Sequence, residues 1–226
     1  MTCDVIATGS KGNAVLLNGK YLFDCGVSLR KIKPYLKSLE VVFLTHIHLD
    51  HFRSTTIYEI HKRRPAVRFV CSRNLLVPLC TVANVSPDNV VLVTPEKPSE
   101  IRLPSETVRI RAVELIHNVE NVGWVVDVEG GESPGKAMYA TDTQYIPVQV
   151  PGLDLYMVEC NHQVDDLKRR RERRIAAGGF VYEDIVAVAH MSQETVTSWL
   201  AQNAGPNSEV VFLHQHIEKA VTEPDE

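Results

Sequence analysis

The chain has 226 residues, and 24 basic against 28 acidic residues give a formal net charge of −4 at pH 7. Its 44% hydrophobic and 23% charged residues are ordinary for a globular protein and exclude collagen-like and wholly disordered classes. A negative total charge provides no global attraction to polyanions, so any contact with nucleic acid has to be local. No apolar run approaches the roughly 20 residues of a membrane-spanning helix.

The first part of the chain predicts a β-meander followed by a helix and a buried strand. β-Rich runs at 3–8, 14–17 and 21–24 are separated by turn residues. Apolar residues then recur at three- and four-residue spacing over 28–39, which predicts a helix, and the compact apolar run 41–44 predicts a buried strand. A strand that follows a helix indicates the start of a βαβ-like layer.

The rest of the chain predicts many short strands and fewer helices. Strands are expected at 67–71, 90–93, 108–115, 122–128, 137–140, 153–158, 185–189 and 210–213. Helices are expected at 54–62, 74–82, 164–175 and 192–202, the last with Ser192 as N-cap. No stretch resembles an interdomain linker, so we expect a single domain over residues 1–226 that contains two sheets flanked by helices.

Four metal-ligating residue types stand within six positions directly after the predicted strand 41–44: His46, His48, Asp50 and His51. Neutral imidazole and carboxylate suit zinc, manganese or iron, and a loop at the end of a strand can turn alternate side chains toward one point. His46 and His48 share one direction, whereas Asp50 and His51 can serve a second metal. A polar surface loop with incidental histidines is the alternative, and the density of ligands favours the metal site.

The pattern H-x-H-x-D-H after an apolar strand and a threonine resembles the signature of the metallo-β-lactamase superfamily. In its nuclease-like and phosphodiesterase-like members, a third histidine, a bridging aspartate and a last histidine follow, each at the end of a strand. His117, Asp142 and His214 fill these three places. The resemblance implies an α/β fold, the αββα sandwich of two mixed β-sheets flanked by helices.

Further segments resemble the WalJ/YycJ-type branch, bacterial proteins described as metal-dependent DNA exonucleases. They are T-G-S-K-G-N at 8–13, F-D-C-G at 23–26, E-C-N-H at 159–162, the basic run 168–174 and A-H-M-S at 189–192. Where the branch has H-L-S after its last strand, this chain has His214-Gln215-His216, so His216 is an alternative last ligand, although the position after the strand favours His214. The chain is also shorter than the branch between the basic run and His190.

The resemblance implies two divalent metal ions, Zn²⁺ or Mn²⁺. One would be held by His46, His48 and His117, the second by Asp50, His51 and His214, and both would be bridged by Asp142. Such a pair lowers the pKa of bound water to about 7 and stabilises a phosphoryl group that is being attacked. Asp50 is also the candidate to accept the proton of that water, because a carboxylate in the metal shell is close and ionised.

His190 is the candidate general acid, because an imidazole outside the ligand set can protonate a leaving alkoxide or brace the scissile phosphate. Capping or packing at the start of the helix 192–202 is the alternative. Glu159, Asn161 and His162 could line the site or orient ligand histidines, and burial with ordinary hydrogen bonds is an equal alternative for them. Asp24, before Gly26, is expected to accept hydrogen bonds from the backbone of the histidine-rich loop.

Lys168, Arg170 and Arg171 in the basic run 168–174 are the candidate substrate-binding residues. A helix that carries these cations suits a phosphate backbone. A solvated helix face that offsets acidic neighbours is an equal alternative.

These observations predict a metal-dependent phosphodiesterase, a nuclease that acts on DNA rather than RNA by the resemblance. The alternatives are a hydrolase of the same fold that acts on a small ester, thioester, lactone or cyclic phosphate, and a non-catalytic nucleic-acid-binding module stapled by metal. Five scattered cysteines without a C-x-x-C pair, and a start that lacks a signal-peptide pattern, predict free thiols in a cytoplasmic protein. The pattern indicates no membrane contact and identifies no protein partner.

Overall fold

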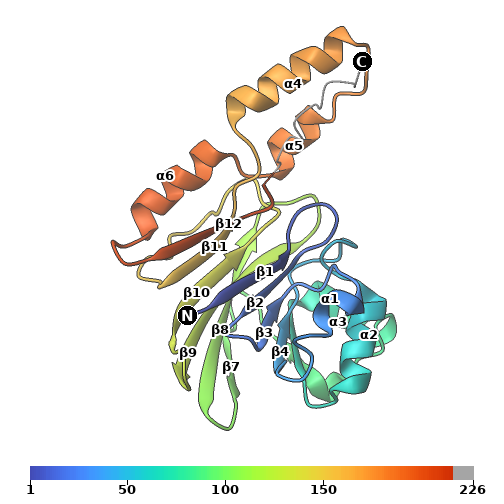
Figure 1. Ribbon diagram of the computed structural model, residues 1–226, viewed down its shortest axis with the longest axis vertical. Coiled ribbons are helices and arrows are strands. Elements are labelled where there is room, and N and C mark those ends of the chain that lie inside the picture. The colour runs from blue at the N-terminus through green and yellow to red at the C-terminus, as the bar shows by residue number, and fades with distance from the viewer. Residues whose placement is uncertain (216–226) are drawn as a thin grey trace, which may run out of the picture.

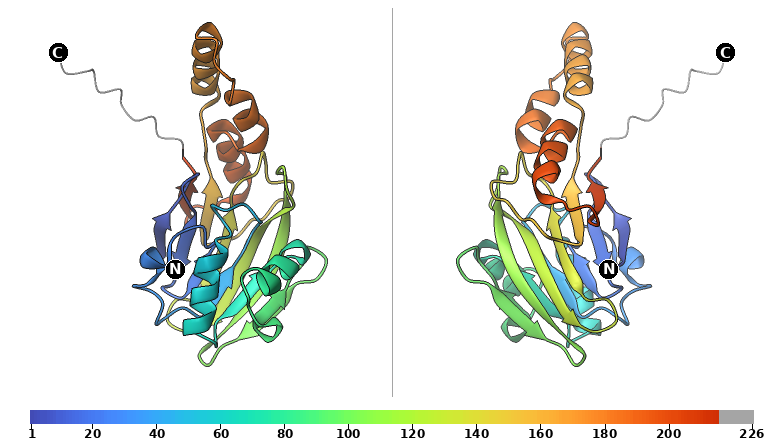
Figure 2. Two further views of the ribbon diagram at one scale, coloured as in Figure 1. Left: turned by 90° about the vertical axis from the view of Figure 1, so that its right-hand side faces the viewer. Right: turned by 90° about the vertical axis from the view of Figure 1, so that its left-hand side faces the viewer.

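Two mixed β-sheets face each other in the computed structural model, which describes residues 1–215 (Figures 1 and 2). The first sheet has the order β1-β2-β3-β4-β5-β6. Its first three strands are antiparallel, and the pairs from β3 to β6 are parallel. Its strands are β1 (Cys3–Ala7), β2 (Ala14–Leu17), β3 (Tyr21–Phe23), β4 (Val41–Phe43), β5 (Arg68–Cys71) and β6 (Val90–Leu92).

The second sheet has the order β12-β11-β10-β9-β8-β7, and its mixed pairing mirrors that of the first sheet. The pairs β12-β11 and β11-β10 are parallel, whereas β10-β9, β9-β8 and β8-β7 are antiparallel. The strands are β7 (Ser99–Arg102), β8 (Glu106–Leu115), β9 (Asn121–Gly130), β10 (Gly135–Ala140), β11 (Leu155–Glu159) and β12 (Glu209–Leu213). The predicted class of two mixed sheets flanked by helices is confirmed.

The main core lies between the two sheets. Alternate residues of β8 are buried, so one face of this strand packs inward and the other is more open. Aromatic rings from both sheets meet there: the ring centroids of Phe23 and Phe43 lie 4.7 Å apart, and Phe43 lies 6.1 Å from Trp124. Trp124 is therefore a core residue and not a surface for stacking bases.

Helices cover the outer faces of both sheets, because each sheet has a second apolar face. The first sheet packs against α1 (Leu29–Ile32), α2 (Ser54–Arg63) and α3 (Arg73–Thr81). The second packs against α6 (Gln193–Asn203), which Ser192 caps by accepting a hydrogen bond from the Thr195 backbone at 3.1 Å. A short 3-10 turn, η1 (Pro87–Asn89), precedes β6.

Two predicted elements are wrong. Residues 185–189 form no strand but lie in helix α5 (Glu183–Ala189), since β11 already pairs with β10 and β12, and the buried residues Val186 and Ala189 are spaced as on a helix. The helix predicted over 28–39 is only the single turn α1, because Pro34 follows at once and supplies no backbone N–H.

Helices α4 (Val164–Ala176) and α5 form an arm, residues 164–189, that projects from the sandwich beyond the ends of β11 and β12 (Figures 1 and 2). The two helices pack against each other, whereas α6 lies along the second sheet. The arm leaves the sheet just after Glu159 and returns at His190, so both of these residues lie at its base. No helix in the described part of the chain has the length and apolarity to cross a bilayer.

Candidate metal centre

The metal loop, residues 45–51, starts directly after the buried strand β4, and the carboxylate of Asp24 anchors it. Asp24 accepts hydrogen bonds from the Thr45 backbone N–H at 3.0 Å and from the Tyr139 hydroxyl at 2.9 Å. Its Oδ2 also lies 2.7 Å from His51 Nδ1. Asp24 has the predicted supporting position, and it holds the Nδ1 proton of His51 so that Nε2 is the ring atom available to a metal.

A close approach of backbones fixes the other side of the loop. A Cβ at Gly26 would lie 1.7 Å from the carbonyl oxygen of Asp50, so only glycine fits there. The turn that joins β1 to β2 completes the contact, because the Asn13 backbone N–H donates to the same carbonyl at 2.7 Å. The Asn13 side-chain amide lies 2.8 Å from His51 Nε2. The glycine-rich turn at 9–13 therefore supports the loop.

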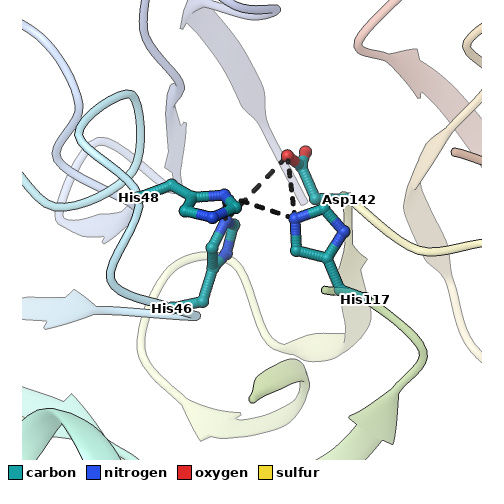
Figure 3. Close-up of side chains that lie close together, drawn as sticks. All are labelled: His46, His48, His117 and Asp142. Atoms are coloured by element: carbon teal, nitrogen blue, oxygen red, sulfur yellow. Dashed lines mark hydrogen bonds and ion pairs between the residues drawn. The ribbon is translucent and has the colours of Figure 1, made fainter. Parts of the chain in front are cut away.

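Three imidazole nitrogens and one carboxylate oxygen form the first cluster (Figure 3). His46 Nε2 lies 3.1 Å from His48 Nδ1, and His48 Nδ1 lies 3.3 Å from His117 Nε2. Asp142 Oδ2 lies 3.9 Å from the Nε2 atoms of both His46 and His117. Tetrahedral zinc ligands about 2.0–2.1 Å from the ion are about 3.3 Å from one another, so this spacing fits a metal ion.

The other carboxylate oxygen of Asp142 faces different partners. Asp142 Oδ1 lies 3.3 Å from His51 Nε2 and 2.9 Å from His214 Nδ1, and His51 Nε2 lies 3.6 Å from Asp50 Oδ2. Two further clusters result: Asp142 with Asp50 and His51, and Asp142 with His214, Glu159 and His190. The structure thus brings the other six predicted ligands around Asp142, but His214 groups with Glu159 and His190 rather than with Asp50 and His51. His216 lies outside the described residues.

The backbone is strained at three of these positions. Asp24, Asp142 and His214 have φ angles of 58°, 53° and 53°, in the left-handed region that side chains other than glycine seldom adopt. Such strain persists where surrounding contacts over-determine the conformation, and it concentrates at functional sites. Each of these three residues follows the end of a strand, where the turn directs its side chain to the cluster.

Burial and neighbouring charges divide the histidines into two types. Burial lowers the pKa of His46 to about 2, assisted by His51, and burial also lowers the pKa of His117. His214 is the opposite: burial opposes its charge, yet the carboxylates of Asp142 and Glu159 raise its pKa to about 10. Asp142 and Asp24 likewise raise the pKa of His51 against the effect of burial. The carboxylates that hold protons on His51 and His214 are the groups that would attract a cation, and a bound metal would displace those protons.

Unpaired atoms supply a second test of whether a metal fits. His117 Nδ1 and His214 Nδ1 are buried and have no hydrogen-bond partner of good geometry among residues 1–215, although His214 Nδ1 is close to two carboxylates. In the first cluster, the three converging imidazole nitrogens lie 3.1 and 3.3 Å from one another, and a cation among them would bind all three lone pairs at once. The donor set therefore fits divalent metal ions.

Glu159 and His190 form a buried pair beside the clusters. His190 Nδ1 lies 2.6 Å from Glu159 Oε1, and the Thr143 backbone N–H donates to Glu159 Oε2 at 2.9 Å. Glu159 is fully buried at the end of β11, and although burial opposes its ionisation, hydrogen bonds from His190 and His214 together lower its pKa. The sequence pointed to Glu159 only as a supporting residue. The structure shows that its partner is His190.

His162 occupies a different place from its neighbours in sequence. Its backbone carbonyl accepts a hydrogen bond from the Gln193 N–H at 2.7 Å, and its Nδ1 lies 3.3 Å from Asn161 Oδ1. Asn161 in turn donates to the carbonyl of His214 at 3.0 Å, which steadies the end of β12. His162 thus takes part in ordinary packing at the start of α6, whereas Asn161 supports the site.

A cavity of about 570 Å³ contains the cluster and extends to the arm. It is lined by ligand residues such as His48 and His214, by His190, and on the far side by residues of α4 and α5. A hollow of similar volume, about 580 Å³, lies on the outer face of the second sheet and is lined by none of the clustered histidines. The chemistry therefore belongs to the cavity beneath the arm.

The three predicted substrate-binding residues separate in the structure. Arg170 lines the cavity of the cluster. Arg171 Nε instead lies 2.6 Å from Asp184 Oδ1, and Lys168 lies 3.9 Å from Asp165. The basic run is thus largely paired with acidic side chains, and Arg170 is the member that faces the site.

Comparison with known proteins agrees with this geometry. Residues 20–215 match the family model described as "Beta-lactamase superfamily domain". Three similar solved structures are the metallo-beta-lactamase fold protein YhfI from Bacillus subtilis, the short form of human tRNase Z, and yeast PDE1. Their identities are 17%, 15% and 9%, with TM-scores of 0.62, 0.59 and 0.60.

These alignments cover most of both partners. They include 94%, 95% and 96% of this chain and 85%, 93% and 88% of YhfI, tRNase Z and PDE1. At these identities the likeness establishes the fold alone. No curated protein matches the sequence significantly, and the WalJ/YycJ-type branch stays a prediction. The family match over residues 20–215 shows that the chain belongs to the beta-lactamase superfamily.

Proposed function

We propose that this protein is a metal-dependent phosphodiesterase that cleaves nucleic acid, with DNA as the preferred polymer. The observation that carries the proposal is the placement of Asp142, whose two oxygens face separate sets of histidines next to the Glu159–His190 pair. Two sets of ligands joined by one carboxylate suit a pair of metal ions, and such pairs recur in phosphatases and nucleases.

Two divalent ions, Zn²⁺ or Mn²⁺, would be held by the predicted ligands: His46, His48 and His117 on one side, and Asp50 and His51 on the other, with Asp142 shared. His214 would join the second set through the Asp142 oxygen that also faces His51, although it groups with Glu159 and His190 in the structure. When bound, they supply Lewis acidity and lower the pKa of water. Burial keeps His46 neutral, so its imidazole presents a lone pair. Asp24 holds the Nδ1 proton of His51, so Nε2 is the His51 atom that would bind a metal, with release of its proton.

Asp50 and His190 would move the protons. Asp50 is partly exposed to the cavity, where it can accept the proton of the attacking water. His190 Nδ1 contacts the carboxylate of Glu159, whose lowered pKa keeps it ionised. The other ring nitrogen of His190, Nε2, would then donate a proton to the leaving oxygen. The arrangement thus provides a base and an acid within one cavity.

Three observations favour nucleic acid over a small ester. The motifs resemble an exonuclease branch, one structural neighbour is a tRNase, and Arg170 lines the cavity as a cation that can contact an anionic phosphodiester. The five cysteines are unpaired, which agrees with the proposed cytoplasmic location.

The test is hydrolysis by purified protein of labelled single-stranded DNA, duplex DNA and RNA, of bis(4-nitrophenyl) phosphate and of 4-nitrophenyl acetate. Each substrate is incubated with Mn²⁺, Zn²⁺ or EDTA. We expect the phosphodiesters to be cleaved, DNA fastest, and EDTA to abolish the reaction. Hydrolysis of the carboxylic ester alone would establish the small-molecule alternative, and metal binding without any turnover would establish the non-catalytic one.

A further inference from the structure

We propose that the arm forms the binding wall for an unpaired nucleic-acid strand, in which Arg170 contacts a backbone phosphate and Tyr182 stacks on a base. The proposal rests on the phosphodiesterase function above and adds the structural class of substrate, a single-stranded segment or end. Nucleic-acid proteins that bind single strands combine cations along the backbone with aromatic rings for the bases.

One face of α5 lines the cavity. Tyr182, Ile185, Val186 and Ala189 all border it, and their spacing of three, one and three residues is that of a single helical face. Ala189 directly precedes His190, so this face leads to the proton donor. With a rise of about 1.5 Å per residue, Tyr182 lies about 12 Å along the helix from His190. A base held there would belong to a nucleotide of the same strand that lies beyond the cleaved bond, along the wall of the cavity.

Arg170 faces this wall from α4. Leu167 and Arg170, one helical turn apart, border the same cavity. The Nε of Arg170 is buried, and no ion pair or hydrogen bond involves Arg170 within residues 1–215. The neighbouring arginines differ, because Arg169 pairs with Asp166, and Arg171 with Asp184. A guanidinium without an acidic partner at the rim of a phosphodiester site is suited to a phosphate oxygen.

Tyr182 supplies the aromatic surface. Its side chain is 50% exposed although it borders the cavity, so one part of the ring is open to a ligand. A base can stack on such a ring only when it is unstacked from its neighbours, as in single strands, bulges and ends. The cavity of about 570 Å³ has the size of a site for a small ligand, which suits a few nucleotides of one strand and not a duplex.

The same arm exposes other apolar side chains, which a second copy of the chain could cover instead. Ile175, Phe180 and Val188 are 50%, 75% and 62% exposed. A nucleic-acid strand is the favoured occupant because Tyr182 and Arg170 both border the cavity that holds the metal cluster. Association of two copies would not require these two residues to lie at that cavity. The oligomeric state is therefore measured in the same experiment.

The experiment compares the binding of fluorescein-labelled oligothymidylate and of a blunt duplex of equal length by fluorescence anisotropy. Binding is measured in EDTA, which prevents cleavage, over a range of salt concentrations. The variants are Arg170→Gln, Tyr182→Ala and Tyr182→Phe. We expect Tyr182→Ala to weaken single-strand binding about tenfold and Tyr182→Phe to retain it. We expect Arg170→Gln to weaken binding and to reduce the salt slope by about one.

Two matched controls lie away from the cavity. Tyr58→Ala removes a tyrosine that is 36% exposed on α2, and Arg169→Gln removes an arginine of the same helix that pairs with Asp166. Both controls should bind like the wild-type protein, and circular dichroism verifies that every variant is folded.

Four outcomes overturn the proposal. Equal affinity for the duplex and the single strand, or wild-type binding by Tyr182→Ala, refutes the strand-binding wall while the phosphodiesterase function stands. A change of oligomeric state in Tyr182→Ala, seen by light scattering, assigns the arm to self-association. A wild-type protein that hydrolyses only 4-nitrophenyl acetate refutes the phosphodiesterase function, and the strand-binding wall with it.

Discussion

The metal loop and the arm border the same cavity, but different interactions hold them. In the metal loop, His46 and His51 are fully buried, and Asp24 fixes Thr45, His51 and Tyr139 through contacts of 2.7–3.0 Å. In the arm, ion pairs such as Arg171–Asp184 join side chains that are 47% and 57% exposed. Buried networks are strongly destabilised by the loss of one member, whereas exposed pairs contribute little.

This difference separates two tasks. Metal ligands have to be held within about 0.5 Å of their working geometry, which a buried, fully bonded network achieves. A surface that receives a flexible polymer benefits from local adaptability, and regions with few buried apolar contacts open more easily. We therefore expect changes in the metal loop to abolish chemistry or folding, and changes in the arm to alter substrate binding.

The largest effect is expected from removal of a ligand. His48→Ala and Asp142→Asn should each lose bound metal and reduce turnover by about a thousandfold or more, because the ligands of one site act as a unit. Metal content by mass spectrometry and turnover of bis(4-nitrophenyl) phosphate are the measurements. Full turnover in either variant would refute the assignment of these ligands.

Replacing the proton donor should have a smaller effect. His190→Gln is expected to lower kcat by about a hundredfold or more while metal content stays unchanged, since general acid catalysis typically contributes about 10²–10⁴. His162→Gln is the matched control, because His162 lies outside the clusters. Equal losses in both variants would show that His190 acts only through the fold.

Asp24 tests the anchor of the metal loop. Asp24→Asn should lower the free energy of unfolding of the metal-free protein by about 3 kcal/mol, because His51 would lose a fully buried ionic partner. Tyr139→Phe removes one hydrogen bond to the same carboxylate and should cost about 1 kcal/mol. Urea unfolding at pH 7 measures both, and an Asp24 variant as stable as the wild type would contradict the anchoring role.

The raised pKa of His214 predicts a pH dependence of the metal-free protein. A histidine whose pKa rises to about 10 on folding stabilises the fold fully below its unfolded pKa of about 6.5, and this stabilisation is lost as the pH rises through about 10. The unfolding temperature in EDTA should therefore fall between pH 7 and pH 10. A His214→Gln variant should show a flatter profile, and an identical profile would reject His214 as the source.

Substitution of a paired arginine in the arm should have the smallest effect on stability and cleavage. Arg171→Gln removes an exposed pair with Asp184 and is expected to leave the unfolding midpoint and metal content unchanged. Its effect on oligonucleotide cleavage should be smaller than that of Arg170→Gln, because only Arg170 borders the cavity. A larger loss in Arg171→Gln would place the substrate on the other side of α4.

The first metal cluster was largely predictable from the sequence. His46 and His48 follow one strand with a spacing that turns both side chains the same way, and His117 and Asp142 each follow the end of another strand. The pattern after the first strand pointed to His46 and His48 by itself, whereas the resemblance to the metallo-β-lactamase superfamily singled out His117 and Asp142 among the residues at strand ends. The position of Asp24 after a strand and before Gly26 likewise identified it as a support.

The sequence alone predicted α5 wrongly, for a physical reason. A run of five apolar residues is too short to distinguish strand from helix by periodicity. The sheet decides between strand and helix here. Strand β11 already has a neighbour on both sides, so residues 185–189 form a helix that packs on α4. One consequence is that α5 contributes a wall of the cavity.

What the sequence determined by itself is the chemistry of the donor set, because residue types at strand ends limit which metals and reactions are possible. What only the tertiary structure decided is which distant residues contact these donors and hold them in place. Glu159 meets His190 from 31 positions away, Tyr139 reaches Asp24 across 115 positions, and Thr8 accepts the backbone hydrogen of His214 across 206. Such contacts depend on how the two sheets pair and pack, which no local pattern encodes.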